Sequence, residues 1–486
     1  MPSLKSKSVH GFAWNFTDSV LTSGILFVTG VILARILSPD DFGLLGIITV
    51  FIGLSTVFID SGFSTWLIRK PDCTQQDYST SFFFNIIVSI SLYLLLYVFS
   101  PAISSFFNQP LLIGLIRTYS LVLIIDSLAI IQRVHFIKRI DFKRQMYISI
   151  LSAMAGGGVG VSMAFCGYGV WSLVCQAVTR QGVNTILFWI LSSWRPSFLF
   201  SKQSFQELFG FGNKILFSGL ITSLQNNIYF FIIGKYFTPA VLGFYTRAEQ
   251  FNAMVVNNIG GPVERVLFPS LSVLQNDDER LKEAIRKTIK ISFLIIATLL
   301  LFLAAIAKPL LFILIGGKWM PSVILLQLMC IATLFYPVDV INLNILKIRG
   351  RSDLILRLQI IKIAMFIPNI VIGIFYGLVP LLITRIFTTI ICTWVNSRYS
   401  GSLLNYSIQE QVNDVFPIFL NSSIALLPVY LLSFLNLNLY ILFTLQICLS
   451  LFLLYSIFEY NKHSEYVEIK EITCRFVKKA VHRNCK

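Results

Sequence analysis

Charged side chains inside otherwise apolar stretches are the residues of this sequence best placed to do chemistry. A charge at the centre of a bilayer costs about 3 kcal/mol or more, so each one needs a partner or a water-filled cavity. The cations in or at the ends of apolar stretches include the candidates Arg35, Arg180, Lys214, Arg247 and Arg385, together with Lys235 at a helix end and with Arg133 and Lys362, which we expect to be snorkelling or interfacial. The acids are fewer, namely Asp18, Asp126 and Asp339, with Asp60 near the end of the second stretch and Glu249 two residues after Arg247. This excess of cations predicts an anionic cargo.

Arg180 and Arg385 occupy similar places in two distant stretches. Arg180 is near the middle of residues 170–192, and Arg385 lies about one turn from the equivalent place in residues 379–396. We expect both to line a central cavity. A structural ion pair, or a hydrogen bond to a broken helix, is the alternative interpretation. Arg247 and Glu249 are two residues apart and do not face each other on a helix.

The acids at depth are candidates for coupling to a counter-ion, H⁺ or Na⁺. Asp126 and Asp339 fall at matching places in the two halves of the chain, which suits a structural capping role at least as well as proton coupling. Asp18 is the best-placed acid in the first apolar stretch. Nothing in the sequence identifies the ion.

The elements that must position these residues are membrane-spanning helices. Hydrophobic residues make up 56% and charged residues 13% of the 486 residues, and the mean hydropathy is +0.76. Soluble domains have about 25% charged residues. Stretches long enough to cross about 30 Å of hydrocarbon recur along the chain. We count fourteen, near 11–34, 43–66, 82–99, 111–134, 147–166, 170–192, 210–234, 242–266, 291–314, 322–345, 355–376, 379–396, 415–434 and 438–457. Their length predicts an all-α polytopic membrane protein and not a β-barrel.

A short pattern occurs twice, 200 residues apart. Residues 34–44 (ARILSPDDFGL) align without gaps on residues 234–244 (GKYFTPAVLGF), with a cation, a proline and a glycine at matching places. Looser matches pair Phe99-Ser100-Pro101 with Ala307-Lys308-Pro309, and Arg139-Ile140-Asp141 with Arg351-Ser352-Asp353. Repeats of this kind predict two homologous helix bundles that rock against each other in a transporter.

The predicted organisation has five parts. They are an N-terminal bundle of six helices at 1–194, a cytoplasmic linker at 195–207, a second six-helix bundle at 208–396, an added helix pair at 410–459 and a basic amphipathic tail at 460–486. We also expect residues 277–290 to form an amphipathic helix that lies on the cytoplasmic surface without spanning.

The charges outside the apolar stretches indicate the topology. The net charge is +16, and most of the 39 Lys and Arg residues lie in the loops of one side, which places both termini in the cytoplasm. Nucleic acid is a poor alternative, since no soluble fold offers it a basic face. The eight cysteines are scattered without a CxxC motif, so we expect neither a disulfide framework nor a metal site, and no cofactor. No cleavable signal peptide is evident.

The N-terminal motifs resemble those of a known family. Residues 11–14 (GFAW), 33–43 (LARILSPDDFG) and 60–69 (DSGFSTWLIR) resemble the polysaccharide-transporter branch of the MOP superfamily. These are the Wzx-type flippases of lipid-linked oligosaccharides, related to lipid II flippases and MATE drug exporters. The resemblance extends over the first twelve helices, and the added helix pair also suits the family.

The resemblance implies a function. The cargo would be an undecaprenyl-pyrophosphate-linked oligosaccharide, moved from the cytoplasmic to the periplasmic leaflet of the bacterial inner membrane. The product would serve a surface polysaccharide such as O-antigen, capsule or exopolysaccharide, with the polysaccharide polymerase machinery as a partner. Arg180, Arg385, Lys214 and Arg35, placed by topology, would then meet the pyrophosphate or acidic sugars.

Two alternatives remain. A MATE-like, cation-coupled multidrug exporter would favour acids in the cavity, where cations dominate here. A polytopic glycosyltransferase or polymerase would need a large extracytoplasmic loop with catalytic carboxylates, and every such loop is short. The sequence also lacks a GxxxxGK[ST] motif for ATP. We therefore predict a transporter and not an enzyme.

Overall fold

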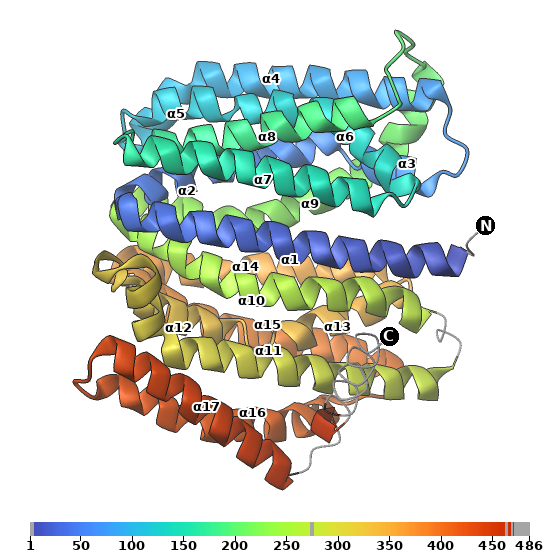
Figure 1. The fold of residues 1–486 in the computed structure, drawn as a ribbon. Helices are drawn as coiled ribbons and strands as arrows, with labels where there is room; N and C mark the ends of the chain where they lie inside the picture. Colours follow the sequence, from blue (N-terminus) through green and yellow to red (C-terminus); the bar gives the residue numbers. More distant parts are fainter. Residues whose placement is uncertain (1–3, 273–276, 462–464, 468–469, 471–486) are drawn as a thin grey trace, which may run out of the picture. The chain divides into compact units, whose positions relative to one another are not determined.

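The computed structural model describes residues 4–272, 277–461, 465–467 and 470, and its regular elements there are all helices (Figure 1). The first ten are α1 (Leu4–Ile36), α2 (Pro39–Asp60), α3 (Phe63–Arg69), α4 (Gln75–Phe107), α5 (Leu112–Tyr119), α6 (Leu121–Lys138), α7 (Phe142–Phe165), α8 (Trp171–Leu191), α9 (Lys202–Tyr236) and α10 (Pro239–Ser272). The others are α11 (Asp278–Ile315), α12 (Ser322–Ala332), α13 (Tyr336–Ile348), α14 (Ser352–Tyr376), α15 (Leu378–Leu404), α16 (Ile408–Leu431) and α17 (Leu439–Asn461), with short 3₁₀ turns at Gly317–Trp319 and Leu432–Phe434.

All fourteen predicted apolar stretches are helical, which confirms the all-α membrane fold. Three of them are broken helices: 43–66 comprises α2 and the start of α3, 111–134 comprises α5 with α6, and 322–345 comprises α12 with α13. Twelve helical segments of the described chain are long and apolar enough to cross a membrane. The remaining two stretches correspond to α8, which carries Arg180, and α10, which carries Arg247 and Glu249. Because these charges lower their hydropathy, the count of fourteen spans stays a prediction.

The chain divides into two compact units, Met1–Thr246 and Arg247–Lys486, and the boundary falls inside α10. In unit 1, α4, α6, α8, α7 and α1 pack one against the next, and α9 packs on α2 and α4. The predicted linker 195–207 overlaps the start of α9 at Lys202. The predicted bundles at 1–194 and 208–396 were defined by the sequence repeat, whereas the two units are defined by contacts within the structure. The bundles therefore stay a prediction.

The repeated pattern forms the same helix–turn–helix in both copies. One helix ends at Ile36 or Tyr236, and the next begins at Pro39 or Pro239. In the first copy Ser38 caps α2, since its Oγ accepts a hydrogen bond from the Asp41 backbone N–H at 3.3 Å. Proline suits this first helical position because its missing N–H would have no partner there.

The two copies of this turn also contact each other within unit 1. A Cβ on Gly43 would lie 1.9 Å from the carbonyl oxygen of Pro239, and a Cβ on Gly243 would lie 1.9 Å from that of Pro39. Only glycine permits such an approach of one backbone to another. The repeat therefore supplies both halves of one reciprocal contact.

A proline near the end of a long helix also occurs in both halves of the chain, at the same distance from the helix end. Pro101 in α4 and Pro309 in α11 each lie seven residues before the residue that caps the helix end, Asn108 and Gly316. Each proline leaves a carbonyl four residues earlier without its helical donor. In α4, Ser100 Oγ donates to that carbonyl, Tyr97 O, at 2.8 Å.

The third predicted match is two residues out of register. The turn after α6 has Ile140 at φ 57°, and the turn after α13 has Gly350 at φ 67°. These left-handed residues place Arg139-Ile140-Asp141 opposite Arg349-Gly350-Arg351, and not opposite Arg351-Ser352-Asp353. The prediction was wrong because an Arg-x-Asp string happens to follow two residues later, while the turn geometry defines the true register.

The amphipathic segment 277–290 is also different from the prediction. It begins α11, which continues without a break to Ile315 over 38 residues. Leu281, Ile285 and Ile289 are fully buried. The segment is thus the first part of a long helix and not a separate surface helix, because its apolar stripe packs within unit 2.

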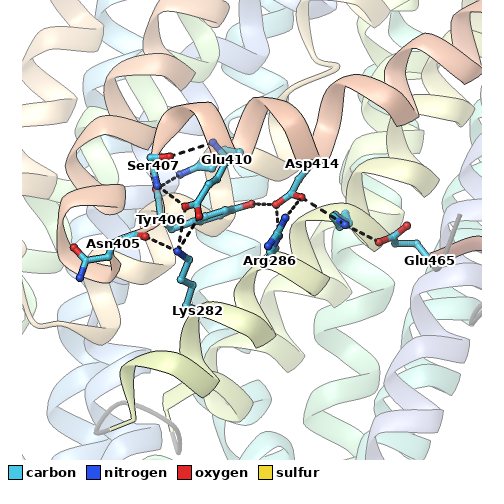
Figure 2. A network of polar contacts seen from close by, with 10 residues as sticks. Lys282, Arg286, Asn405, Tyr406, Ser407, Glu410, Asp414 and Glu465 are labelled. Atoms are coloured by element: carbon cyan, nitrogen blue, oxygen red, sulfur yellow. Dashed lines mark hydrogen bonds and ion pairs between the residues drawn. The ribbon is translucent and has the colours of Figure 1, made fainter.

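The neighbouring basic stripe, one residue further along the helix, attaches the added helix pair α16–α17 (Figure 2). Arg286 Nε and Nη2 donate to the two carboxylate oxygens of Asp414 at 2.6 and 2.7 Å, and Lys282 Nζ lies 3.1 Å from Glu410. The Tyr406 hydroxyl donates to Asp414 at 2.8 Å. Burial raises the pKa of the Tyr406 phenol far above its ordinary range, and the hydrogen bond to Asp414 raises it further. Tyr406 therefore stays protonated and remains a donor.

A second attachment of the pair lies at the proline of α11. Gln446 of α17 donates Nε2–H to Ala305 O at 3.3 Å, the carbonyl that Pro309 leaves without a donor. Lys308 Nζ donates to Ser433 O, after α16, at 2.8 Å. The added pair therefore completes the hydrogen bonding of α11, a role that Ser100 alone plays in α4.

Candidate functional site

Arg180 lies at the contact between α7 and α8 in unit 1. A Cβ on Gly156 would lie 2.6 Å from the Arg180 Cβ, so the glycine lets α7 approach close to the arginine. The Arg180 side chain is half-buried, and no carboxylate pairs with it among the residues that the structure describes. Its electrostatic partner is the phenol of Tyr119 in α5. Such a cation is available to bind an anion.

Lys214 lies at a groove along α9, also in unit 1. The groove has a volume of about 560 Å³. Lys214, Ser218, Thr222 and Asn226 line it at intervals of four residues, so they share one face of the helix and are all exposed. Among the described residues that line this groove, Lys214 alone is charged. One cation followed by hydroxyls and an amide suits a phosphate with attached sugar hydroxyls.

Arg35 and the corresponding Lys235 lie in the last turns of α1 and α9. A cation is favoured there by the partial negative charge of the last carbonyls. Lys235 Nζ donates to Phe106 O at 2.6 Å and lies 4.1 Å from the centre of the Phe106 ring, so it ties α9 to the end of α4. Arg35 is exposed at its helix end.

The predicted cations of unit 2 have different surroundings. Arg247 is only 4% exposed, and its guanidinium carbon lies 5.7 Å from the centre of the Trp319 ring. It also donates to Gln250 Oε1. Arg385 of α15 lies opposite Glu249 of α10, with Nη1 3.9 Å from Oε2. Arg247 and Glu249 thus turn to different partners, and a structural role suits Arg247 better than contact with a cargo.

The paired acids Asp126 and Asp339 are each held by a cation and an amide. Asp126 accepts from Arg133 Nη2 at 2.8 Å and from Gln181 Nε2 at 2.5 Å. Asp339 accepts from Lys362 Nζ at 2.9 Å and from the Asn396 amide.

Both acids follow the break of a helix by six residues, the breaks lying at Ser120 and Thr333. Both oxygens of Asp339 accept a hydrogen bond, whereas both partners of Asp126 bind its Oδ1, and this pairing with a cation and an amide fits the structural alternative for these two residues. Sequence reasoning missed the amide partners, because Gln181 and Asn396 lie 55 and 57 residues from the acids that they bind.

Asp18 differs from these two acids. It accepts hydrogen bonds from Thr22 Oγ1 at 3.0 Å and Ser149 Oγ at 3.3 Å. In the described part of the chain it forms no salt bridge. It remains the candidate among the three whose negative charge no cation neutralises.

Glycines of α9, and one in the turn after α2, are a feature that the sequence-based prediction did not use. A Cβ on Gly212 would lie 2.3 Å from Ser61 O, and one on Gly62 would lie 2.8 Å from the Ile215 Cβ. Gly219 approaches Val57 in the same way, at 2.9 Å. Small residues at regular spacing let membrane helices pack closely, and their spacing was the signal that could have revealed this seam beside the Lys214 groove.

Comparisons with known proteins agree with this architecture. The model of a family described as "Polysaccharide biosynthesis protein" matches residues 32–324. The teichuronic acid biosynthesis protein TuaB of Bacillus subtilis is 25% identical over 356 residues, 73% of this chain and 74% of that protein. The lipopolysaccharide biosynthesis protein WzxC of Escherichia coli is 26% identical over 377 residues, 76% of each.

Two solved structures show the same fold. The lipid II flippase MurJ, in an inward closed conformation, has a TM-score of 0.73 at 14% identity and covers 91% of this chain and 97% of its own. An inward-facing MATE multidrug transporter of the MOP superfamily has a TM-score of 0.59 at 16% identity, covering 81% and 96%. The resemblance inferred from the N-terminal motifs is confirmed: this multi-pass membrane protein has the MOP fold and belongs to the polysaccharide biosynthesis protein family.

Proposed function

We propose that this protein is a flippase that moves an undecaprenyl-pyrophosphate-linked oligosaccharide from the cytoplasmic to the periplasmic leaflet for a surface polysaccharide. Membership of the family, the names of TuaB and WzxC and the fold shared with MurJ support this class of transporter over an enzyme. The observation that carries the proposal is Arg180, a cation within an apolar helix that pairs with no carboxylate of the described chain. A pyrophosphate supplies the missing negative charge.

The other polar residues have roles that follow from their surroundings. Lys214 meets a phosphate oxygen, while Ser218, Thr222 and Asn226 along the same groove hydrogen-bond sugar hydroxyls. Arg385 adds a second cation. Alternating access moves the cargo, the bundles 1–194 and 208–396 rocking as rigid bodies.

The setting of the protein follows from the same proposal. Its basic loops face the cytoplasm, so both termini are cytoplasmic and the membrane is the bacterial inner membrane. The polysaccharide polymerase machinery receives the product. Asp18, half-buried in α1 without a salt bridge in the described chain, is the acid best suited to couple transport to H⁺ or Na⁺.

A MATE-like drug exporter is the second candidate, favoured by the fold alone. A cationic drug needs accessible carboxylates, but Asp126 and Asp339 are each engaged by a cation and an amide. The charges therefore favour an anionic cargo.

The test is export of surface glycan in cells that depend on this chain. Arg180→Ala and Lys214→Ala should each reduce export at least about tenfold, the loss expected for one charged hydrogen bond, while protein in the membrane stays at the wild-type level. Arg180→Lys should retain part of the activity because it keeps the charge. Arg280→Ala removes an arginine whose side chain is 77% exposed, and it is the matched control. Normal export by both Arg180→Ala and Lys214→Ala would overturn the site.

A further inference from the structure

An apolar pocket of unit 2 lies where α13, α15 and α16 meet. It has a volume of about 220 Å³, and its wall includes Phe335, Ile390, Val415 and Phe419. Among the described residues that line it, none is charged. Pockets with an apolar wall and a few polar groups are typical of sites for amphiphilic ligands.

The pocket is open to the surface of unit 2. Trp394, Val412 and Phe416 line it and are each about half exposed. The helices that carry them, α15 and α16, are both long and apolar enough to cross a membrane. Exposed apolar surface on such helices contacts lipid, so the chain of a bilayer lipid can enter the pocket from the side.

One hydroxyl in the pocket wall has no partner. A threonine in a helix commonly donates to a carbonyl of the preceding turn, as Thr389 of α15 does to Arg385 O at 2.9 Å. Thr393 is buried and lines the pocket, yet its Oγ1 forms no hydrogen bond with any residue that the structure describes. A buried polar group without a partner is costly, so an acceptor on a ligand would stabilise it.

A cation lies beside the same wall. The guanidinium carbon of Arg398 is 5.8 Å from the centre of the Trp394 ring, and the side chain is exposed. Within the described part of the chain no carboxylate pairs with Arg398. Glu410 and Asp414, on the neighbouring helix α16, bind cations of α11 instead. A guanidinium in this position can bind a phosphate.

These groups follow one another along α15 as the parts of a glycerophospholipid do. The apolar Ile390 comes first, then the hydroxyl of Thr393, then Arg398. The last two are about 7.5 Å apart along the helix axis, at 1.5 Å per residue. An acyl chain, an ester carbonyl and a phosphate match them in the same order.

We propose that this pocket binds one acyl chain of an anionic glycerophospholipid. Thr393 donates to the ester carbonyl and Arg398 donates to the phosphate. A headgroup with a net negative charge is preferred to one that carries an amine, because the acids of α16 already bind cations. The bound lipid adds a contact between α15 and α16, the first helix of the added pair. The inference goes beyond the proposed function and does not depend on the cargo.

Native mass spectrometry of the full-length protein tests the site, since it counts bound lipids individually. The probes are dioleoyl-phosphatidylglycerol and dioleoyl-phosphatidylcholine, which have the same acyl chains and differ in headgroup charge. Wild type should bind one phosphatidylglycerol at least about tenfold more tightly than phosphatidylcholine, the factor for one charged hydrogen bond.

Three variants separate the parts of the site. Arg398→Ala should weaken phosphatidylglycerol binding about tenfold or more and remove the preference for it. Thr393→Val should weaken both lipids about 3- to 10-fold, the range for a neutral hydrogen bond. Val412→Trp enlarges an exposed side chain at the pocket, so it should block the acyl chain of both lipids while the protein still folds.

The matched control is Arg280→Ala, which removes an exposed arginine of unit 2 that does not line the pocket. It should bind both lipids as wild type does. Wild-type binding by both Arg398→Ala and Val412→Trp would overturn the site. Equal affinity of wild type for the two lipids would overturn the anionic headgroup. If farnesyl pyrophosphate, a short analogue of a prenyl pyrophosphate, displaces the bound phosphatidylglycerol, the pocket takes the cargo's tail and the phospholipid assignment is wrong.

Discussion

The cation-bearing helices of the two units, α8 in unit 1 and α15 in unit 2, place similar arginines in different electrostatic surroundings. Arg180 has a tyrosine as its electrostatic partner, whereas Arg385 faces the carboxylate of Glu249 at 3.9 Å. The backbone turns of the repeat, by contrast, match residue for residue around Pro39 and Pro239. The difference teaches that the scaffold was duplicated while the charges diverged, so the two units should bind an anion unequally.

The largest effects should come from removing each arginine in turn. Arg180→Ala should weaken binding of farnesyl pyrophosphate by about 10- to 100-fold, the range for a lost charged hydrogen bond. Because no carboxylate of the described residues pairs with Arg180, this loss should be the same at low and high pH. Arg385→Ala should instead cost less, because the carboxylate of Glu249, 3.9 Å away, already interacts with this guanidinium.

Affinities of the two variants across the pH range test this contrast. Arg280→Ala, which removes an exposed arginine of unit 2, serves as the control. Equal losses for Arg180→Ala and Arg385→Ala would mean that the two cations work in equivalent surroundings.

Asp126 and Asp339, which follow the helix breaks of units 1 and 2, allow a second comparison, based on the free energy of unfolding. Asp339→Asn leaves Lys362, whose side chain is 14% exposed, without its carboxylate, while Asp126→Asn does the same to Arg133, which is 36% exposed. A more buried cation is costlier to leave unpaired. We expect a loss of about 2 kcal/mol in unfolding free energy for Asp339→Asn and about 1 kcal/mol for Asp126→Asn.

Thermal unfolding of the purified variants measures the difference. Asp72→Asn alters an exposed loop carboxylate in unit 1 and should leave the midpoint unchanged. A wild-type midpoint for Asp339→Asn would show that the carboxylate is not structural, and it would return Asp339 to the candidates for ion coupling.

The sequence predicted the helices well because apolar length and the proline–glycine turns act locally. Each of the fourteen stretches is helical, and the Ser38-Pro39 turn recurs at Thr238-Pro239. The excess of cations at depth was also readable from residue type. The sequence could not show which charged side chains pair with each other. Whether Arg385 meets Glu249, 136 residues away in the chain, depends on how helices pack, and no local spacing encodes that contact.

The sequence also failed to predict the register of one repeat match and the continuity of the long helix α11. The match of residues 139–141 with 351–353 relied on a three-residue string, while the left-handed turn residues Ile140 and Gly350 define a register two residues earlier. Similarly, the amphipathic start of α11 resembles a surface helix until its apolar stripe is seen to be buried. Both errors arose where tertiary packing, and not local composition, decides the structure.

The smallest effect is the most direct test of the comparison, since it would make unit 1 resemble unit 2. Tyr119→Glu gives Arg180 a carboxylate neighbour where it now has a phenol. At high pH the new anion should compete with the cargo and weaken binding of farnesyl pyrophosphate by about 3- to 10-fold, the strength of a partly buried ion pair. At low pH the carboxyl becomes neutral and the affinity should recover.

Tyr119→Phe, which removes only the hydroxyl, should keep the wild-type pH profile. If Tyr119→Glu keeps that profile too, then a nearby carboxylate is not what distinguishes Arg385 from Arg180, and the difference between the units must lie in how far each guanidinium is open to water.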